Sequence, residues 1–160
     1  LPRRARFMAK EELFGIRFVG AAMRFFGAFP VRRNSADRGA LREAVRCLEA
    51  GEALVIFPEG GGNPDGRLQP LHPGPLLVAL QAGVPVVPAA IVDANRVLPY
   101  GTLRPRRSDR PVRVLFGEPI DLSDLRGQRG AVEAATRRLA ERLAALLEQP
   151  VPEGKPAIRD

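Results

Sequence analysis

The sequence predicts an α/β fold in which a mixed, largely parallel central sheet is flanked by helices. Short apolar segments typical of buried strands alternate along the chain with segments whose apolar residues have helical spacing. With 160 residues, 45% of them hydrophobic and 27% charged, the chain has the size and composition of one ordinary globular domain. We expect this domain to occupy residues 1–148 and a flexible, proline-rich tail to occupy residues 149–160.

The first part of the chain predicts two short strands and a helix. Residues 6–9 and 28–31 have the character of strands. The helix that follows can be capped by Ser35 or Asp37 and is stopped by Gly51. Its apolar residues, which keep the spacing of one helix face, are Leu41, Ala44, Val45 and Leu48.

A further helix is predicted within residues 13–26, a segment rich in phenylalanine, glycine and alanine. Phe14, Phe18, Ala22 and Phe25 approximate one stripe along it. We interpret this stripe as the side of the helix that faces the protein core. The alternative is an interfacial contact with a membrane surface.

The remaining elements alternate in the same way. In order they are a strand at 53–57, a loop at 58–74, a helix at 76–82, strands at 86–92 and 112–116, and a helix at 131–147. The strand at 53–57 is an uninterrupted apolar run, so we expect it to be fully buried.

The loop after this strand carries the residues with the greatest chemical interest. Ligands of open α/β sheets usually bind beyond the carboxyl ends of strands, and glycines such as Gly60–Gly62 let backbone amides approach an anion. Glu59 is either a structural acceptor for amides of the loop or a site residue. Arg32 and Arg33 also end a strand, where they form either a solvated pair or an arginine fork that binds phosphate.

The single cysteine, the single histidine and the net charge limit the kinds of site and partner that the chain can have. Cys47 is the single cysteine, so an internal disulfide and a multi-cysteine metal site are excluded, and we expect it to be an inert core residue. His72, the single histidine, has no nucleophile or orienting partner at local spacing, which favours a hydrogen-bonded loop residue over a base. The net charge of +7 favours anionic partners: phosphate groups, anionic lipids or nucleic acid.

Six segments together resemble a known family in order and spacing. They are Arg6–Leu13, Gly27–Arg33, Phe57–Gly60, Asp65–Leu68, Ala82–Pro88 and Val112–Ile120. They resemble the glycerolipid acyltransferases of the lysophosphatidic acid type. Phe57–Gly60 alone would be a weak signal, whereas several segments in register are specific.

The resemblance implies an enzyme of phospholipid biosynthesis. It would transfer a fatty acyl group from acyl-CoA or acyl carrier protein to lysophosphatidate, giving phosphatidate, with no cofactor besides the acyl donor and no nucleic-acid partner. It would lie in the cytoplasm, peripherally associated with the inner face of the cell membrane. The sequence does not indicate an oligomeric state.

The resemblance also assigns roles to residues of this chain. The residues that match the phosphate-binding positions of the family are Arg33, Glu59, Gly60 and Gly61, with Arg32 and Arg67 as possible secondary contacts. Pro88 matches a proline at a strand that shapes the acyl side of the family's site.

The sequence departs from the family pattern at the catalytic base. The family uses a histidine paired with an aspartate five residues later, and here Leu77 stands at that distance from His72. No catalytic residue is therefore assigned, and we expect the chain to be N-terminally incomplete and nearly inactive by itself. The glycine loop continues as Gly60–Asn63, where the family usually has Gly-Thr-Arg-Ser.

Two other functions compete with acyl transfer. A non-catalytic module that binds lipid or a membrane surface could use the phenylalanine-rich helix and the arginines. A nucleic-acid binder is disfavoured, because Tyr100 is the single tyrosine, tryptophan is absent and no binding motif is present.

Overall fold

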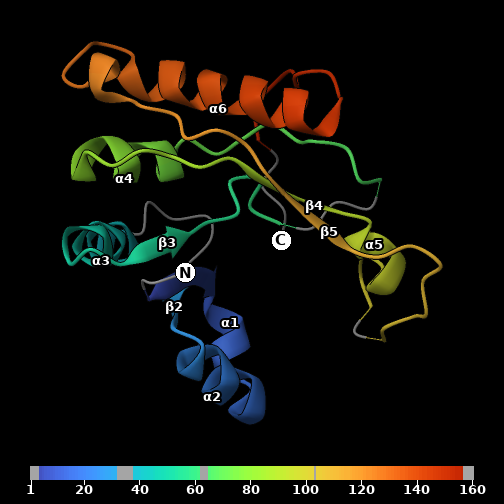
Figure 1. The fold of residues 1–160 in the computed structure, drawn as a ribbon. Helices are drawn as coiled ribbons and strands as arrows, with labels where there is room; N and C mark the ends of the chain where they lie inside the picture. Colours follow the sequence, from blue (N-terminus) through green and yellow to red (C-terminus); the bar gives the residue numbers. More distant parts are fainter. Residues whose placement is uncertain (1–3, 32–37, 62–64, 103, 157–160) are drawn as a thin grey trace. The chain divides into compact units, whose positions relative to one another are not determined.

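The computed structural model describes residues 4–31, 38–61, 65–102 and 104–156, which fall into two compact units (Figure 1). The first unit runs to Phe57 and includes Gly74–Val84; the second consists of Pro58–Pro73 and of the chain from Pro85 onward. Each unit has a sheet of its own. Among the described residues, no helix combines the length and the apolar character that crossing a membrane requires.

The sheet of the first unit is parallel. Its strands are β1 (Ala5–Lys10), β2 (Ala28–Val31) and β3 (Ala53–Val55), in the spatial order β2-β1-β3. Phe7 of β1 pairs with Ala28 on one side and with Val55 on the other. Helices connect these strands along the chain, as parallel neighbours require. The predicted α/β class and the parallel pairing are confirmed.

Two helices complete the core of the first unit. α3 (Arg38–Glu49) and α4 (Gly74–Ala82) pack against each other. The buried core residues are Phe29, Ala44, Cys47 and Val78, and the partly buried residues against them include Leu41, Val45 and Leu48. The predicted apolar face of α3 is thus confirmed, whereas the predicted caps, Ser35 and Asp37, lie outside the described residues.

The predicted full burial of residues 53–57 is wrong. β3 ends at Val55, its residues are only half-buried, and Phe57 is 59% exposed. The reason is its place in the sheet: in the order β2-β1-β3, β3 is an edge strand that pairs with β1. An uninterrupted apolar run does not distinguish an edge strand from a central one.

The predicted core-facing stripe of residues 13–26 is also wrong. The segment forms two helices, α1 (Glu11–Phe14) and α2 (Arg17–Phe25), and Phe18 and Phe25 are 89% and 86% exposed. α2 instead buries Gly20, which lies against the backbone of Phe14 so closely that a side chain would collide with it. Close backbone packing through glycine, rather than phenylalanine burial, therefore orients this helix.

The second unit contains a two-stranded antiparallel sheet. β4 (Ala89–Val92) pairs with β5 (Arg113–Phe116), so that Ile91 faces Val114 across the ladder. β4 is shorter than the predicted strand at 86–92, because Val86 makes only an isolated bridge to Ile120. The short helix α5 (Ala94–Val97) follows β4.

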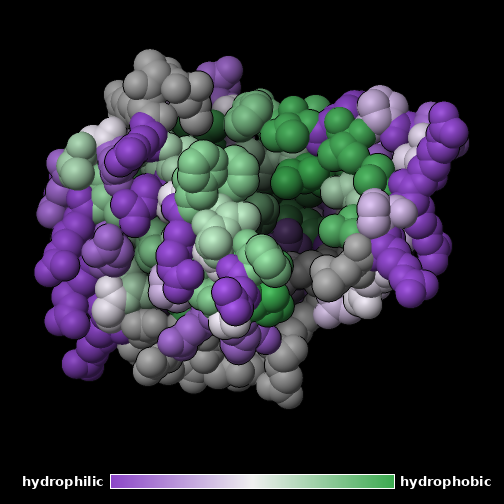
Figure 2. Space-filling view, turned by 90° about the horizontal axis from the view of Figure 1, so that it is seen from below, coloured by the Kyte–Doolittle hydropathy of each residue, from purple (hydrophilic) through white to green (hydrophobic). Residues whose placement is uncertain are grey.

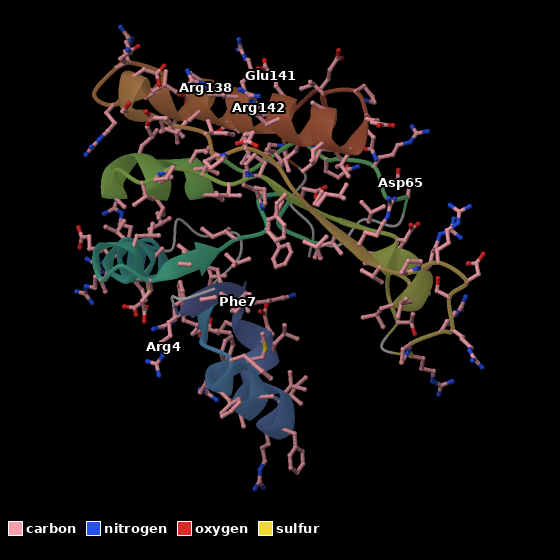
Figure 3. The ribbon with its side chains drawn as sticks, viewed as in Figure 1. Arg4, Phe7, Asp65, Arg138, Glu141 and Arg142 are labelled. Atoms are coloured by element: carbon pink, nitrogen blue, oxygen red, sulfur yellow. The ribbon has the colours of Figure 1, made fainter. Side chains whose placement is uncertain are left out.

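The last helix, α6 (Ala131–Leu147), begins and ends where the sequence predicts. It buries one side, whose members are Ala135, Leu139, Ala140, Leu143 and Ala144. Its outer side carries charged residues, among them Glu141 and Arg142 (Figure 3). Buried and charged residues thus separate onto two sides, as on most helices that cover a core.

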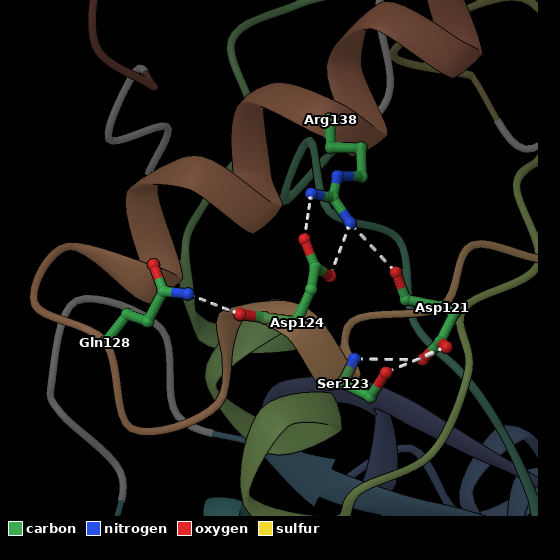
Figure 4. Close-up of polar contacts among 5 residues, drawn as sticks. All are labelled: Asp121, Ser123, Asp124, Gln128 and Arg138. Carbon is green, nitrogen blue, oxygen red and sulfur yellow. Dashed lines mark hydrogen bonds and ion pairs between the residues drawn. The ribbon is translucent and has the colours of Figure 1, made fainter.

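α6 is joined to the short 3₁₀ turn η1 (Ser123–Leu125) by a forked ion pair (Figure 4). The guanidinium of Arg138 donates to both carboxylate oxygens of Asp124, at 2.9 and 2.7 Å, and to the backbone carbonyl of Asp121 at 2.9 Å. The hydrogen bond from Arg138 lowers the pKa of Asp124. Hydrogen bonds from the backbone and hydroxyl of Ser123 lower the pKa of Asp121.

Candidate functional site

The loop between β3 and α4, residues 58–73, is closed at its base by two hydrogen bonds. The backbone N–H of His72 donates to the carbonyl of Pro58 at 2.8 Å. The backbone N–H of Gln69 donates to Oε2 of Glu59 at 2.9 Å. Of the two roles left open for Glu59, the structural acceptor is therefore present in the structure.

Gly60 adopts a conformation that requires glycine. Its φ is +73°, and a Cβ atom at this position would lie 2.8 Å from Nε2 of His72 and 2.9 Å from Cδ2. The imidazole thus packs directly against the Gly60 backbone. A glycine at positive φ lets backbone amides come close to an anionic group.

The far end of the loop is held from the C-terminal end of α6. Gln149 accepts a hydrogen bond from the N–H of Leu68 at 2.8 Å and donates one to the carbonyl of Gly66 at 3.2 Å. The side chain of Leu68 is buried, whereas Asp65 is exposed at the outer end of the loop (Figure 3). The described parts of the loop are therefore anchored at its base and, through Gly66 and Leu68, at the end of α6.

The predicted phosphate-binding residues divide into two groups. Glu59, Gly60 and Gly61 are half-buried in this loop, and Arg67 is exposed in its outer part. Arg32 and Arg33 lie outside the described residues. The joint cradle of arginines and glycine loop therefore stays a prediction.

The residues that hold the loop, Gln69 and Gln149, were not found from the sequence. Gln149 lies 81 positions from Leu68, just after the last helix, in a segment that the sequence assigns to the tail. Glutamine in such a place has no local signature. Only a three-dimensional arrangement reveals its pairing with the loop.

In the part of the chain that the structure describes, Cys47 and the acidic residues form neither a reactive thiol site nor a metal site. Burial in the core raises the pKa of the Cys47 thiol, which favours the unreactive protonated form. Within the described ranges no cluster of histidine, cysteine, aspartate and glutamate could hold a metal ion.

Comparison with known proteins shows which protein family contains a loop of this kind. The family model described as Acyltransferase matches residues 1–92, which is more than half of the chain. The chain belongs to the acyltransferase family. The matched range contains the glycine loop and the upstream segments that resemble the lysophosphatidic acid type.

Individual relatives are of that type. The chain is 31% identical to the chloroplastic 1-acyl-sn-glycerol-3-phosphate acyltransferase BAT2 of Brassica napus, over 72% of this chain and 34% of the relative. It is 28% identical to the 1-acyl-sn-glycerol-3-phosphate acyltransferase of Bacillus subtilis (strain 168), over 92% of this chain and 66% of the relative. The resemblance to this type of acyltransferase is confirmed.

A solved structure agrees with the sequence relatives. The crystal structure of PlsC, the 1-acyl-sn-glycerophosphate (LPA) acyltransferase of Thermotoga maritima, matches with a TM-score of 0.62 and 31% identity. The match covers 86% of this chain and 56% of that protein. The chain thus spans between a third and two thirds of the length of these three relatives.

Proposed function

We propose that this member of the acyltransferase family transfers a fatty acyl group to the free hydroxyl of lysophosphatidate and so forms phosphatidate. One observation carries the proposal: relatives that align with most of the chain are named for this acceptor, 1-acyl-sn-glycerol-3-phosphate. The hydroxyl oxygen forms an ester bond with the acyl carbon while the carbon–sulfur bond of the thioester breaks. The proton of the hydroxyl passes through a base to the departing thiolate.

We assign the phosphate of the acceptor to Arg33 and to the backbone of Gly60 and Gly61, with Arg32 and Arg67 as secondary contacts. An arginine can bind two phosphate oxygens at once, and glycine amides at a turn can bind the others. Glu59 serves this site through the loop, because its carboxylate accepts the N–H of Gln69. A carboxylate in direct contact with phosphate would instead repel it.

The acyl donor is a thioester of coenzyme A or of acyl carrier protein, and no further cofactor takes part in this proposal. A long acyl chain and a lysolipid acceptor both partition into bilayers. We therefore place the enzyme peripherally on the inner face of the cell membrane.

Arg33 provides the test of the substrate. In an active form of the enzyme, Arg33→Ala is expected to raise the KM for lysophosphatidate by at least about tenfold, since a charge-assisted phosphate contact is lost. The KM for the acyl donor should change little. Arg42→Ala, which removes an exposed arginine of α3, is the control and should leave both values unchanged. Equal losses for both substrates would contradict the assignment of Arg33 to the acceptor.

The 160-residue chain by itself should turn over slowly. His72 lacks an aspartate five residues later, and loss of a general base lowers rates by about 10² to 10⁴. An assay of the purified chain with acyl-CoA and lysophosphatidate measures this directly. Turnover at a rate typical of acyltransferases would contradict the predicted inactivity and leave the family assignment unchanged.

A non-catalytic lipid-binding module is the second candidate. The exposure of Phe18 and Phe25 favours it, because a membrane contact needs accessible apolar side chains. Activity in any form of the enzyme that retains the glycine loop would decide for acyl transfer.

A further inference from the structure

The exposed side of α2 is apolar, which is the reverse of an ordinary surface helix. Phe18 is 89% exposed and Phe25 is 86% exposed, and Ala21 and Ala22 between them are exposed as well. These residues follow one another at the spacing of a single helix face. The opposite side of α2 is the one that buries Gly20.

Neighbouring residues enlarge this apolar surface. Phe26 is 67% exposed, and its ring packs edge-on against that of Phe25, with 5.4 Å between the centroids. Ile16, in the turn before α2, is 53% exposed. Figure 2 is seen from below Figure 1, where α2 is drawn, and it shows hydrophobic residues exposed at this surface. A contiguous apolar surface of this kind marks a contact with something outside the chain.

The charges that α2 itself carries are of one sign, whereas the acidic residues nearest in sequence, Glu11 and Glu12, belong to α1. Arg17 and Arg24 are the only charged residues between Leu13 and Val31, and both are exposed. They are seven residues apart and therefore form a second ridge along α2, next to the phenylalanine ridge. The guanidinium of Arg24 lies 5.4 Å from the ring centroid of Phe14. This contact seats a cation at the border of the apolar surface.

We propose that the α2 face, defined as Ile16, Phe18, Phe25 and Phe26 with Arg17 and Arg24, docks the protein onto an anionic phospholipid bilayer. The phenylalanine rings would enter the boundary between headgroups and acyl chains, and the two guanidinium groups would bind lipid phosphates. A second copy of the chain fits this face less well, because a symmetric contact would bring arginines against arginines.

The inference deepens the proposed function, on which it rests in one respect: an acceptor that is a lysolipid must be taken from a bilayer. Docking itself needs no turnover. A vesicle-binding experiment can therefore fail while acyl transfer stands, and acyl transfer can fail while docking stands.

Sedimentation of the 160-residue chain with phosphatidylcholine vesicles, with and without phosphatidylglycerol, tests the proposal. The chain should bind the anionic vesicles more strongly than the neutral ones. The double variant Phe18→Ser/Phe25→Ser should lower binding to both kinds by at least about tenfold. Arg17→Gln/Arg24→Gln should lower binding to the anionic vesicles alone, by about fivefold for each arginine.

Two matched variants serve as controls. Phe57→Ser/Phe116→Ser removes two other phenylalanines, which are 59% and 70% exposed. Arg104→Gln/Arg107→Gln removes two exposed arginines of the loop between α5 and β5. Neither should change vesicle binding. All variants should have the circular dichroism spectrum and the thermal unfolding temperature of the wild type, because every substituted side chain is exposed.

Several results would overturn the proposal. They are a wild-type chain that does not bind vesicles, α2-face variants that bind as the wild type does, and loss of binding in the control variants instead. A dimer in sedimentation velocity that the Phe18→Ser/Phe25→Ser variant dissociates, with vesicle binding unchanged, would show that a second copy occupies this face.

Discussion

At position 60 the absence of a side chain decides the shape of the candidate site. The backbone has a φ of +73° there, and the imidazole of His72 occupies the space that a Cβ would take. Gly66 also has a positive φ, +68°, but the nearest atom to a Cβ there is Nδ2 of Asn95 at 3.7 Å, an ordinary contact. The same loop thus contains two glycines that differ in the space around them.

Gly60→Ala is expected to lower the free energy of unfolding by about 2–3 kcal/mol, and Gly66→Ala by about 1 kcal/mol. Both substitutions place an alanine at positive φ, and only the first also collides with a neighbour. Urea unfolding measures the difference. In a His72→Ala background the excess cost of Gly60→Ala should disappear. An excess that persists without the imidazole would contradict this account.

At the scale of elements, contacts between distant segments hold the second unit together. Gln149 ties the end of α6 to the loop at 66–68, and Arg138 ties the middle of α6 to η1 (Figure 4). The carboxylate of Asp124 is stabilised by the hydrogen bond from Arg138, so its pKa is lower in the folded chain than in the unfolded one. This link should therefore depend on pH.

The contribution of the Asp124–Arg138 pair should be present above about pH 4 and lost as the pH falls. The unfolded chain protonates Asp124 near its ordinary value of 3.8, while the folded chain keeps it ionised to lower pH, so acid favours unfolding. Asp124→Asn should be less stable than the wild type at neutral pH and lose less stability toward acid. Urea unfolding between neutral and acidic pH measures this.

Asp109→Asn is the control for this comparison, because Asp109 is an exposed carboxylate of the same unit that lies 3.9 Å from Arg96. It should retain the wild-type dependence on pH. If the free energy of unfolding depended on pH identically in the two variants, the Arg138 contact would not be the cause of the predicted pH dependence. The effect is small, since both partners are accessible to solvent, with 57% of the Asp124 side chain and 34% of the Arg138 side chain exposed.

At the scale of the whole molecule, the first unit buries Phe29 among small and medium side chains and leaves the phenylalanines of α2 exposed. Cys47 and Ala44 are 4% and 0% exposed, whereas Phe18 and Phe25 are almost fully exposed. Cys47 packs with Phe29 and Val78, which come from β2 and α4. The reactivity of its thiol therefore indicates whether the core formed by β2, α3 and α4 is intact.

Alkylation of Cys47 should be slow in the folded chain. Burial raises the pKa of the thiol and shields it, so iodoacetamide at about pH 8 should react at least about 100-fold more slowly than with the chain unfolded in urea. Mass spectrometry after timed quenching measures the two rates, and the single cysteine makes the product unambiguous. Similar rates in both states would mean that the core opens readily.

The sequence by itself determined most of the elements and the family. Helical spacing at Leu41–Leu48 and in the last helix depends on neighbours within a few residues, so it can be read locally. The same holds for a stop at Gly51, whose φ of +76° is readily adopted by glycine because it has no side chain. The family emerges from segments such as Phe57–Gly60 because several of them occur in register.

The tertiary structure alone decided that the Phe18 side chain is exposed, that β3 is only half-buried, and what holds the loop. Phe18 and Val55 have apolar neighbours, but their burial depends on whether a second layer or strand reaches them, and α2 packs through Gly20 while β3 lies at an edge. The partners of Glu59 and Leu68 are Gln69 and Gln149, at separations of 10 and 81 residues. Hydrogen bonds across such distances leave no periodic trace in a sequence, because they depend on how the elements pack.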